Sequence, residues 1–476
     1  MFKKGKVKQI ESIQEVIVVG LFDKGLKDLS FLGSDLASLL ERKLKNKSLS
    51  SSKGDTQTLL LPGNYKSAGL VIVGLGDKKK TQQEYRDVFQ NLAKLLNQDA
   101  TVFLDSFIGS SKISVVAKLF AEELTSSKYV FDQLKSKPAP RKDISINYVS
   151  SKDVSSIIDE GFIVGSAMNS AKTLVNLPHN LLNSIDLANY ATDLAKKYGF
   201  KAKIYDKPEI EKMGMTAFLA VNQGSAIPPK LIVLKYQGLP KWSDPITLVG
   251  KGLTFDTGGY NIKTNSKNMK SDMGGAATVL GVIEAAARLK MKVNILVIIA
   301  STDNMISGDA FVPDDVITAA NGKTIEIFST DAEGRLTLAD ALWFAQTKEN
   351  ADHIIDFATL TGAVVVALGG YTGVFTNNRK MVKQYLDAAE REQELAWELP
   401  IGDFFVKAIK GKVADIDNAG TRAGGASAAA AFLQEFIEPK TKWVHCDIAG
   451  TATDANNFGT GSMVRTTLEY LRQFDR

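Results

Sequence analysis

The sequence contains very little cysteine and histidine: of 476 residues, one is cysteine and three are histidine. The single cysteine, Cys446, excludes a disulfide within the chain and a metal cluster held by thiolates. No other feature indicates an oxidising compartment. His179, His353 and His445 do not pair at metal-ligand spacing, so we interpret each as structural.

Long hydrophobic runs are also missing. No window approaches the length of apolar residues that a membrane-spanning helix requires. The apolar run Val16–Phe22, which follows the basic N-terminus, is short and ends at Asp23 and Lys24. This is typical of a strand and not of a signal sequence. We therefore predict a soluble, cytoplasmic protein that does not contact a membrane.

The excess of positive charge is small for a chain of this length. The formal net charge is +5, and lysines gather in short runs within residues 1–8 and 78–80. Such runs usually lie in solvent, so nucleic-acid binding is an alternative and not our main expectation. A hydrophobic content of 44% and a charged content of 23% are typical of globular proteins and exclude a disordered chain.

Short apolar runs alternate with helical patterns from the N-terminus onward. Strands are expected at residues 16–19 and 69–73, and helices at residues 35–45 and 85–96. This alternation predicts an α/β fold. Gly74-Leu-Gly76 follows a strand but lacks the third glycine of a dinucleotide fingerprint, so it predicts a tight turn.

The length of the chain favours two domains. Apolar residues recur at helical spacing from Val154 to Val175, and the pattern stops at Pro178. We predict a smaller N-terminal α/β domain of residues 1–150, a connecting helix at residues 151–175 and a larger domain of residues 176–476.

The larger domain is predicted to contain a mixed, mostly parallel sheet flanked by helices. Mostly apolar strands expected at residues 230–234, 246–250 and 293–300 alternate with a helix at residues 276–289. Asn321-Gly322 lies between two short β-rich runs and predicts a hairpin, because both residues tolerate positive φ.

Two glycine-punctuated stretches carry most of the candidate site residues. Residues 247–275 read TLVGKGLTFDTGGYNIKTNSKNMKSDMGG, and residues 329–336 read STDAEGRL. In the first stretch a strand is expected to end at Lys251, and α/β sheets place ligand sites at such carboxyl ends of strands. Their charged residues are Lys251, Asp256, Lys263, Asp272, Asp331, Glu333 and Arg335.

Each stretch alone has a structural explanation. Thr330-x-x-Glu333 has the form of a helix capping box, and the first stretch could be a turn with ordinary exposed charges. Arg335, however, is not required by a cap. Together, four carboxylates would repel one another or stay unpaired, whereas two divalent cations would neutralise them. Oxygen ligands suit Mn²⁺, Mg²⁺ or Zn²⁺.

The two stretches resemble signature segments of the leucyl aminopeptidase family, a family of dinuclear metallo-exopeptidases. The resembling segments are GKGLTFDTGGYNIK, NMKSDMGGAA and TDAEGRLTLADAL. The likeness continues through residues 304–308, 321–327, 358–363 and 447–451 and covers most of residues 165–476. Residues 1–150 match only in their α/β character.

The resemblance implies a set of metal ligands. Asp256 and Glu333 would bridge two divalent ions, Asp331 would complete one site, and Lys251 with Asp272 would complete the other. The ions would be Mn²⁺ or Zn²⁺, with Mg²⁺ or Co²⁺ as alternatives in one site. A lysine ligand must be neutral, which a neighbouring dication favours by lowering its pKa.

The resemblance also implies a reaction. A hydroxide between the metals would attack the scissile carbonyl while the free α-amino group of the substrate binds one metal. Lys263 would stabilise the oxyanion. Arg335 would hold a bicarbonate ion that moves the proton. The expected activity is release of N-terminal leucine or other apolar residues from short peptides.

A side-chain pocket and an assembly follow from the same resemblance. Met269, Ser329, Thr359 and Gly362 are candidates to line the pocket, and Ser329 stands where the family commonly has asparagine. Asp303 replaces a common glutamate, with no consequence that we can derive. A hexamer is expected. Some family members also act as DNA-binding accessory proteins, which is the alternative function.

Overall fold

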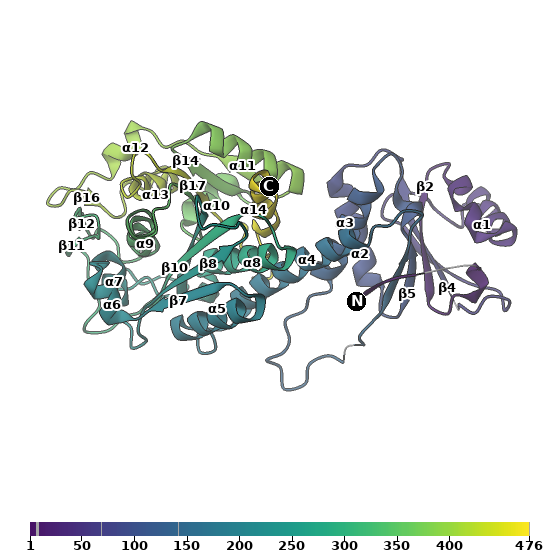
Figure 1. Ribbon diagram of the computed structural model, residues 1–476, viewed down its shortest axis with the longest axis horizontal. Helices are drawn as coiled ribbons and strands as arrows, with labels where there is room; N and C mark the ends of the chain where they lie inside the picture. Colours follow the sequence, from purple (N-terminus) through teal and green to yellow (C-terminus); the bar gives the residue numbers. More distant parts are fainter. Residues whose placement is uncertain (6–8, 68, 141, 476) are drawn as a thin grey trace. The chain divides into compact units, whose positions relative to one another are not determined.

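The computed structural model describes residues 1–5, 9–67, 69–140 and 142–475. The chain divides into two compact units, residues 1–166 and 167–476. A helix, α4 (Ser155–Asn176), occupies the segment where the sequence predicts one, and the division falls inside it (Figure 1). The domain boundaries at residues 150 and 176 stay a prediction.

The N-terminal unit contains a six-stranded sheet in the order β1-β6-β5-β2-β4-β3. Neighbouring strands are parallel, except that β3 is antiparallel to β4. The strands are β1 (Phe2–Lys4), β2 (Val16–Phe22), β3 (Thr56–Leu60), β4 (Gly69–Gly76), β5 (Ala100–Phe103) and β6 (Ile146–Val149). The helices are α1 (Ser34–Lys45), α2 (Gln82–Leu95) and α3 (Ile113–Ser127).

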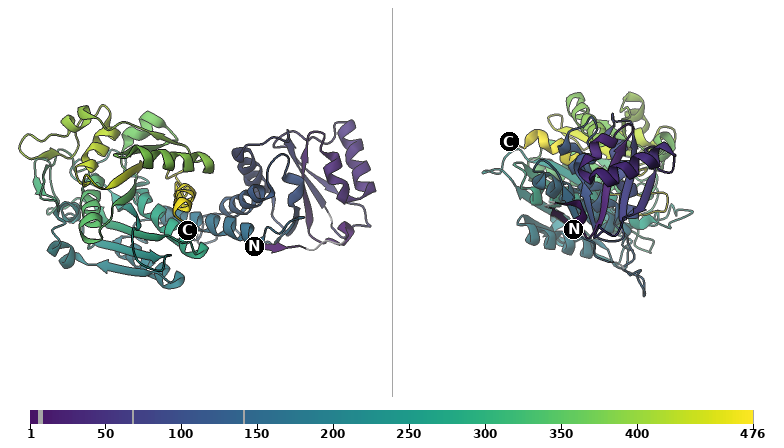
Figure 2. Two further views of the ribbon diagram at one scale, coloured as in Figure 1. Left: turned by 45° about the horizontal axis from the view of Figure 1, so that its top comes forward. Right: turned by 90° about the vertical axis from the view of Figure 1, so that its right-hand side faces the viewer.

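The apolar composition of β2 follows from burial on both faces of the sheet. Val16 and Val18 belong to the core that includes α2 and α3, whereas Ile17 and Val19 belong to the core that includes α1. Figure 2 shows helices on both sides of these strands. The alternation of side chains along a strand therefore needs apolar residues at every position here.

Gly74-Leu-Gly76 forms the end of β4, and the chain bends just after it, at residues 77–78. A Cβ atom on Gly74 would lie 2.3 Å from the carbonyl oxygen of Ser52, and Gly76 has a φ of +66°. Thr81 then caps α2 through a capping box with Glu84. Close backbone approach explains these glycines without a nucleotide.

The C-terminal unit contains an eight-stranded mixed sheet in the order β15-β14-β17-β13-β9-β10-β8-β7. The central strands β17, β13, β9 and β10 are parallel to one another. The strands are β7 (Lys201–Tyr205), β8 (Lys230–Gln237), β9 (Ile246–Asp256), β10 (Asn294–Asn304), β13 (His353–Ala358), β14 (Thr372–Thr376), β15 (Ala396–Glu398) and β17 (Lys442–Asp447). The predicted mixed, mostly parallel sheet is confirmed.

Helices cover both faces of this sheet (Figure 1). Val249 and Leu253 of β9 pack in one core with α7, α9 and α13, and α8 packs against β9 and β13. The helices are α5 (Ser184–Tyr198), α6 (Lys207–Lys212), α7 (Thr216–Asn222), α8 (Gly274–Leu289), α9 (Gly334–Lys348), α10 (Gly362–Leu368), α11 (Arg379–Glu392), α12 (Asp403–Ala408), α13 (Gly425–Gln434) and α14 (Val464–Leu471). Within the described chain, no helix is long and apolar enough to cross a membrane.

The predicted hairpin at Asn321-Gly322 is confirmed. Strand β11 (Val316–Thr318) pairs antiparallel with β12 (Thr324–Glu326), and Gly322 has a φ of +85°. Strand β16 (Ile416–Asp417) adds a third strand parallel to β12. The hairpin leads the chain to Ser329, beside the carboxyl ends of the central strands.

Candidate metal centre

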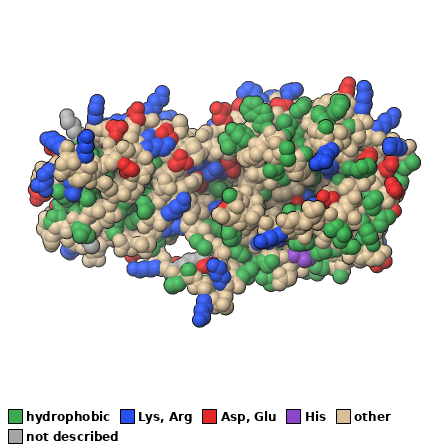
Figure 3. Space-filling view, turned by 180° about the vertical axis from the view of Figure 1, so that it is seen from behind, with side chains coloured by type: hydrophobic (Ala, Val, Ile, Leu, Met, Phe, Trp, Pro, Cys, Tyr) green, Lys and Arg blue, Asp and Glu red, His purple; other side chains and the backbone are tan. Residues whose placement is uncertain are grey.

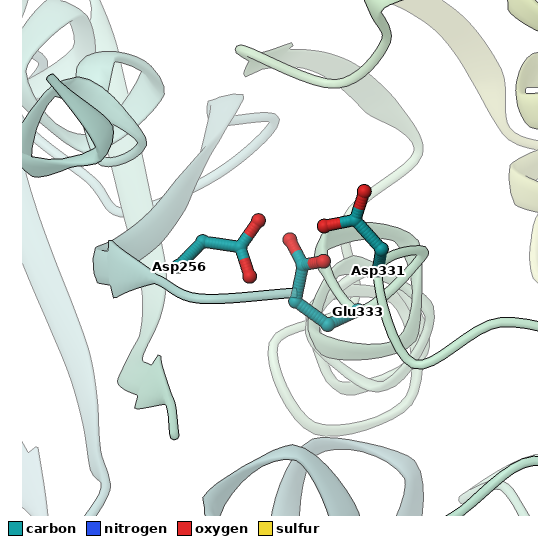
Figure 4. A group of neighbouring side chains, drawn as sticks. All are labelled: Asp256, Asp331 and Glu333. Atoms are coloured by element: carbon teal, nitrogen blue, oxygen red, sulfur yellow. The ribbon is translucent and has the colours of Figure 1, made fainter. Parts of the chain in front are cut away.

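Three carboxylates from two separate stretches meet at one end of the large sheet. Asp256 is the last residue of β9, and Asp331 and Glu333 lie in the loop before α9. One oxygen of each side chain lies within 4.8 Å of the others. Figure 4 shows the three side chains pointing toward one another. Asp256 and Glu333 are buried, and Asp331 is exposed.

Two lysines bind these carboxylates and a fourth one. The Nζ atom of Lys251 lies 2.8 Å from Asp272 and 3.1 Å from Glu333. The Nζ atom of Lys263 lies 2.7 Å from Asp256 and 2.5 Å from Asp331. The six charged residues predicted to surround the metals and the scissile bond are thus brought together by the fold.

The pKa values of two carboxyl groups in the cluster are raised, because the positive charge nearby does not balance their negative charges. Burial, together with the charges of Glu333 and Asp272, raises the pKa of Asp256 to about 8. Burial likewise raises the pKa of Asp272 to about 6, although Lys251 opposes the shift. The two lysines therefore do not fully compensate for the desolvation and mutual repulsion of these groups.

The donor set fits divalent cations. The Oε2 atom of Glu333 is buried and has no hydrogen-bond partner among the described residues. Leaving such an oxygen unpaired is costly, and a cation would satisfy it. The pKa of Lys251 is raised, because the carboxylates of Asp272, Glu333 and Asp256 outweigh the burial that opposes its charge. A dication in this place would reverse that balance and favour the neutral amine.

Arg335 lies in the first turn of α9, next to the carboxylates. Its Nη1 atom donates to the carbonyl oxygen of Asn418 at 2.8 Å, and its Nε atom is buried without a hydrogen-bond partner in the described chain. Burial lowers the pKa of Arg335 to about 10. The group is still a cation near neutral pH, with an unused donor that suits a small oxyanion.

The capping-box interpretation of Thr330-x-x-Glu333 is wrong. Glu333 itself is the residue that precedes α9, and no side chain caps this helix. The Oγ1 atom of Thr330 instead donates to the carbonyl oxygen of Gly258 and accepts from the backbone N–H of Asn261. A long-range contact between the two stretches has replaced the local one that the spacing suggested.

A cavity of about 280 Å³ opens beside the carboxylates. Of the predicted pocket residues, Met269, Thr359 and Gly362 line it, whereas Ser329 is not among its lining residues. The hydroxyl of Ser329 turns back and accepts a hydrogen bond from the N–H of Asp331. Arg335 also lies outside the lining, and apolar side chains complete the wall, namely Val365, Ala449 and Ala452.

Larger hollows occur elsewhere on the same unit. One of about 920 Å³ lies between α11 and β15 at the edge of the sheet, and it contains none of the clustered carboxylates. The volume of a hollow therefore does not identify the active site in this protein. We assign the site to the smaller cavity, because the buried charged residues converge there.

Two asparagines that we did not predict as site residues hold the centre in place. The Nδ2 atom of Asn304 donates to Asp256 at 2.8 Å and to the carbonyl oxygen of Thr330 at 3.0 Å. Asn418 accepts from the N–H groups of Phe328 and Ser329. The only sequence signal given above is the resemblance at residues 304–308, which includes Asn304.

The three histidines have structural partners, in line with our interpretation. His353 Nε2 lies 2.7 Å from the hydroxyl of Tyr470, and His445 Nδ1 lies 2.6 Å from Asp356. His179 Nε2 lies 3.1 Å from Asp303. Asp303 thus faces an imidazole.

The lysine runs offer little support for a nucleic-acid surface. Lys78 pairs with Asp28, and Lys80 pairs with Glu84. The lysines at positions 6 and 8 lie outside the described residues. On the face shown in Figure 3, Lys and Arg side chains are dispersed among acidic ones and do not form one stripe.

Known proteins resemble this chain in both units. The sequence model of the cytosol aminopeptidase family matches with its catalytic domain at residues 169–468 and with its N-terminal domain at residues 18–138. A probable cytosol aminopeptidase of Bacillus licheniformis is 44% identical over 487 aligned positions, which cover 97% of each chain. A probable cytosol aminopeptidase of Bacillus subtilis (strain 168) is 44% identical over 483 positions, which cover 97% of this chain and 96% of that one.

Solved structures show the same architecture. The bottromycin maturation enzyme BotP superposes with a TM-score of 0.85 at 28% identity, covering 97% of this chain and 100% of BotP. BotP in complex with Mn superposes with a TM-score of 0.86 at 28% identity, covering 98% of this chain and 100% of BotP. The likeness extends over both units.

Proposed function

Because the chain belongs to the cytosol aminopeptidase family, the leucyl aminopeptidase family that its motifs resemble, we propose that this hydrolase releases N-terminal leucine or other apolar residues from short peptides. The observation that carries the proposal is the convergence of Asp256, Asp331 and Glu333, each supplying an oxygen within 4.8 Å of the others. An acidic cluster of this kind, in which Asp256 and Glu333 are buried, needs cations.

Five residues would hold two divalent ions. Asp256 and Glu333 would bridge them, Asp331 would complete one site, and Lys251 with Asp272 would complete the other. Mn²⁺ is supported by the manganese complex of BotP, and Zn²⁺ suits the same donors, with Mg²⁺ or Co²⁺ as alternatives in one site. When bound, such ions would polarise a carbonyl and would make water nucleophilic at neutral pH.

The remaining charged residues act on the substrate and on protons. Lys263 places a cation between Asp256 and Asp331, where it would stabilise negative charge on the carbonyl oxygen of the scissile bond. Arg335 would hold a bicarbonate ion through its buried Nε atom, and the bicarbonate would accept and return a proton. On this proposal, the side chains of Lys263 and Arg335 have separate tasks.

The walls of the cavity support a preference for apolar N-terminal residues. Met269, Val365, Ala449 and Ala452 contribute hydrocarbon surface next to the carboxylates. Burial of a leucine side chain against such a wall is favourable by roughly 1.5–3 kcal/mol. The free α-amino group of the substrate would be held on the acidic side, which restricts cleavage to the first residue.

A hexamer in the cytoplasm is the assembly and location we propose. The curated relatives are called cytosol aminopeptidases. Large apolar side chains are exposed on the catalytic unit, including Val366 of α10 at 89%, Phe404 of α12 at 66% and Val413 at 76%. Helices α10 and α12 both pack against α13, and Figure 3 shows further apolar groups on this unit. Exposed surface of this kind favours subunit contact, which sedimentation would test.

The experiment that tests the activity uses metal-stripped protein. Chelated enzyme is reconstituted with Mn²⁺ or Zn²⁺ and incubated with Leu-Gly or with N-acetyl-Leu-Gly. We expect metal-dependent release of leucine from the free peptide and none from the acetylated one, because the latter lacks the α-amino group. Glu333→Gln serves as the control for the metal site. Absence of leucine release by folded, metal-loaded protein would refute the proposal.

A further inference from the structure

A second hollow adjoins the catalytic cavity. It has a volume of about 670 Å³ and lies between the chain that follows α4 and the loop of residues 263–270. Lys263, Lys267 and Lys270 line it, and no aspartate or glutamate of the described chain does. We call this feature the lysine hollow. Its positive charge sets it apart from the acidic cavity beside it.

Two of the three lysines lack a carboxylate partner. Lys267 is exposed, and neither it nor Lys270 forms an ion pair in the part of the chain that the structure describes. The Nζ atom of Lys270 donates to the carbonyl oxygen of Asn176 at 2.6 Å. An anion in the hollow would give both lysines the charged partner that they lack within the described chain.

Polar and apolar groups complete the wall. Asn265 and Ser266 lie beside the lysines, and Phe255 and Pro178 form an apolar side. His179 also lines the hollow, where Asp303 lies 3.1 Å from its Nε2 atom. The hollow therefore combines cationic donors with a hydrophobic surface, as a site for an organic anion requires.

Lys263 connects the lysine hollow with the catalytic cavity, because this residue is part of the lining of both. An extended peptide spans about 3.3–3.6 Å per residue. A group that lies one or two residues beyond the scissile bond would therefore lie a short distance past Lys263. In a dipeptide or tripeptide, that group is the C-terminal carboxylate.

We propose that the lysine hollow binds the C-terminal carboxylate of the substrate, so that the protein selects short peptides with a free C-terminus. The inference rests on the proposed aminopeptidase function and adds the substrate class to it. Lys270 and Lys267 would act as specificity-determining residues. Lys263 would keep its place beside the scissile carbonyl.

The test compares Leu-Gly-Gly with its C-terminal amide on the metal-loaded enzyme. We expect a lower KM for the free acid. Lys270→Met should raise that KM roughly tenfold, and Lys267→Met severalfold, through loss of a charge-assisted contact. The KM of the amide and kcat should change little, and Lys270→Arg should restore the preference for the acid. Lys440→Met, which removes an exposed lysine elsewhere on the same unit, is the matched control.

A binding measurement separates this inference from the proposed function. N-acetyl-Leu-Gly-Gly and its amide are titrated calorimetrically onto the metal-loaded protein, which we expect to leave acetylated peptides uncleaved because they lack the α-amino group. Tighter binding of the acid, lost in Lys270→Met, supports the lysine hollow even if turnover were absent. Equal binding of acid and amide, or equal loss of both in the variant, would overturn it.

A third experiment uses inorganic phosphate as a competitor, because a free anion could bind to the same lysines. If phosphate competes with the acid but not with the amide, the two share the hollow, as expected. If phosphate binds in a Lys270-dependent manner while acid and amide are hydrolysed alike, the hollow serves a free anion and the substrate proposal is wrong.

Discussion

The Oγ1 atom of Thr330 donates a hydrogen bond of 2.7 Å to the carbonyl oxygen of Gly258 and so ties the loop before α9 to the loop after β9. The same hydroxyl accepts from the N–H of Asn261 at 2.9 Å. One loop carries Asp331 and Glu333, and the other follows Asp256. The spacing between the carboxylates therefore depends on this contact.

Thr330→Val should weaken the metal centre. Valine matches threonine in shape but leaves the buried carbonyl oxygen of Gly258 without its donor, which costs about 1–3 kcal/mol. We expect weaker binding of Mn²⁺ and lower activity at limiting metal, both measured by titration of chelated protein. Thr347→Val removes a similar bond, from Thr347 to the carbonyl oxygen of Trp343 on exposed helix. If both variants bind Mn²⁺ with the same affinity, the hydrogen bond from Thr330 to Gly258 does not support the metal centre.

Thr330 also shows where sequence analysis reaches its limit. The spacing Thr330-x-x-Glu333 satisfies the local rule for a cap, and only the fold reveals that Gly258, 72 positions earlier, competes for the hydroxyl. Local patterns describe what a segment can do alone. They do not show whether a residue from a distant segment will take the place of the local hydrogen-bond partner.

The fold itself was largely predictable, because its signals are local. The apolar run of β2 and the Asn321-Gly322 turn are each specified by their own residues, and both are predicted correctly. Asn304 was not predicted as a site residue, since an asparagine at the end of a strand gives no sign that it donates to Asp256. Such supporting groups emerge only when two strand ends lie side by side.

Gly334→Ala should disable the enzyme without unfolding it. A Cβ atom on Gly334 would lie 2.4 Å from Cε and 2.6 Å from Nζ of Lys251. The flexible lysine tip can move away, so the fold should survive, and alanine is the better helix former at the start of α9. We expect a large loss of turnover with little change in Tm.

Gly308→Ala is the matched control for this substitution, because a Cβ atom there meets nothing within 4 Å. It should retain the turnover of the unmodified enzyme. Unaltered activity of Gly334→Ala, assayed with Leu-Gly under saturating Mn²⁺, would show that the position of Lys251 is unimportant to catalysis.

Lys263→Ala should lower kcat while metal content stays high. The lysine is expected to stabilise charge that develops on the scissile carbonyl, and loss of one such donor costs roughly 10²–10³-fold in kcat. Asp256 and Asp331 lose their ion pairs with its Nζ atom but would remain neutralised by the metals. Steady-state kinetics and metal analysis of the same sample check this, and a kcat equal to that of the unmodified enzyme would refute the assigned role.

His353 should make the fold sensitive to acid. Burial, with the nearby charge of Lys442, lowers the pKa of His353 from 6.5 to about 4. The folded state therefore disfavours the protonated imidazole. The stabilisation by the neutral form is fully present above pH 6.5 and is lost progressively as pH falls to about 4, up to about 3 kcal/mol in total. Denaturant unfolding across this pH range measures the loss.

His353→Gln should remove this part of the pH dependence, because glutamine does not titrate. Tyr470→Phe is the matched control: it deletes the hydroxyl that lies 2.7 Å from His353 Nε2 but leaves the imidazole buried. Its stability should be lower at every pH, while the slope between pH 6.5 and 4 persists. Since burial is the leading cause of the shift, parallel pH profiles for His353→Gln and the unmodified protein would assign the acid sensitivity to other groups.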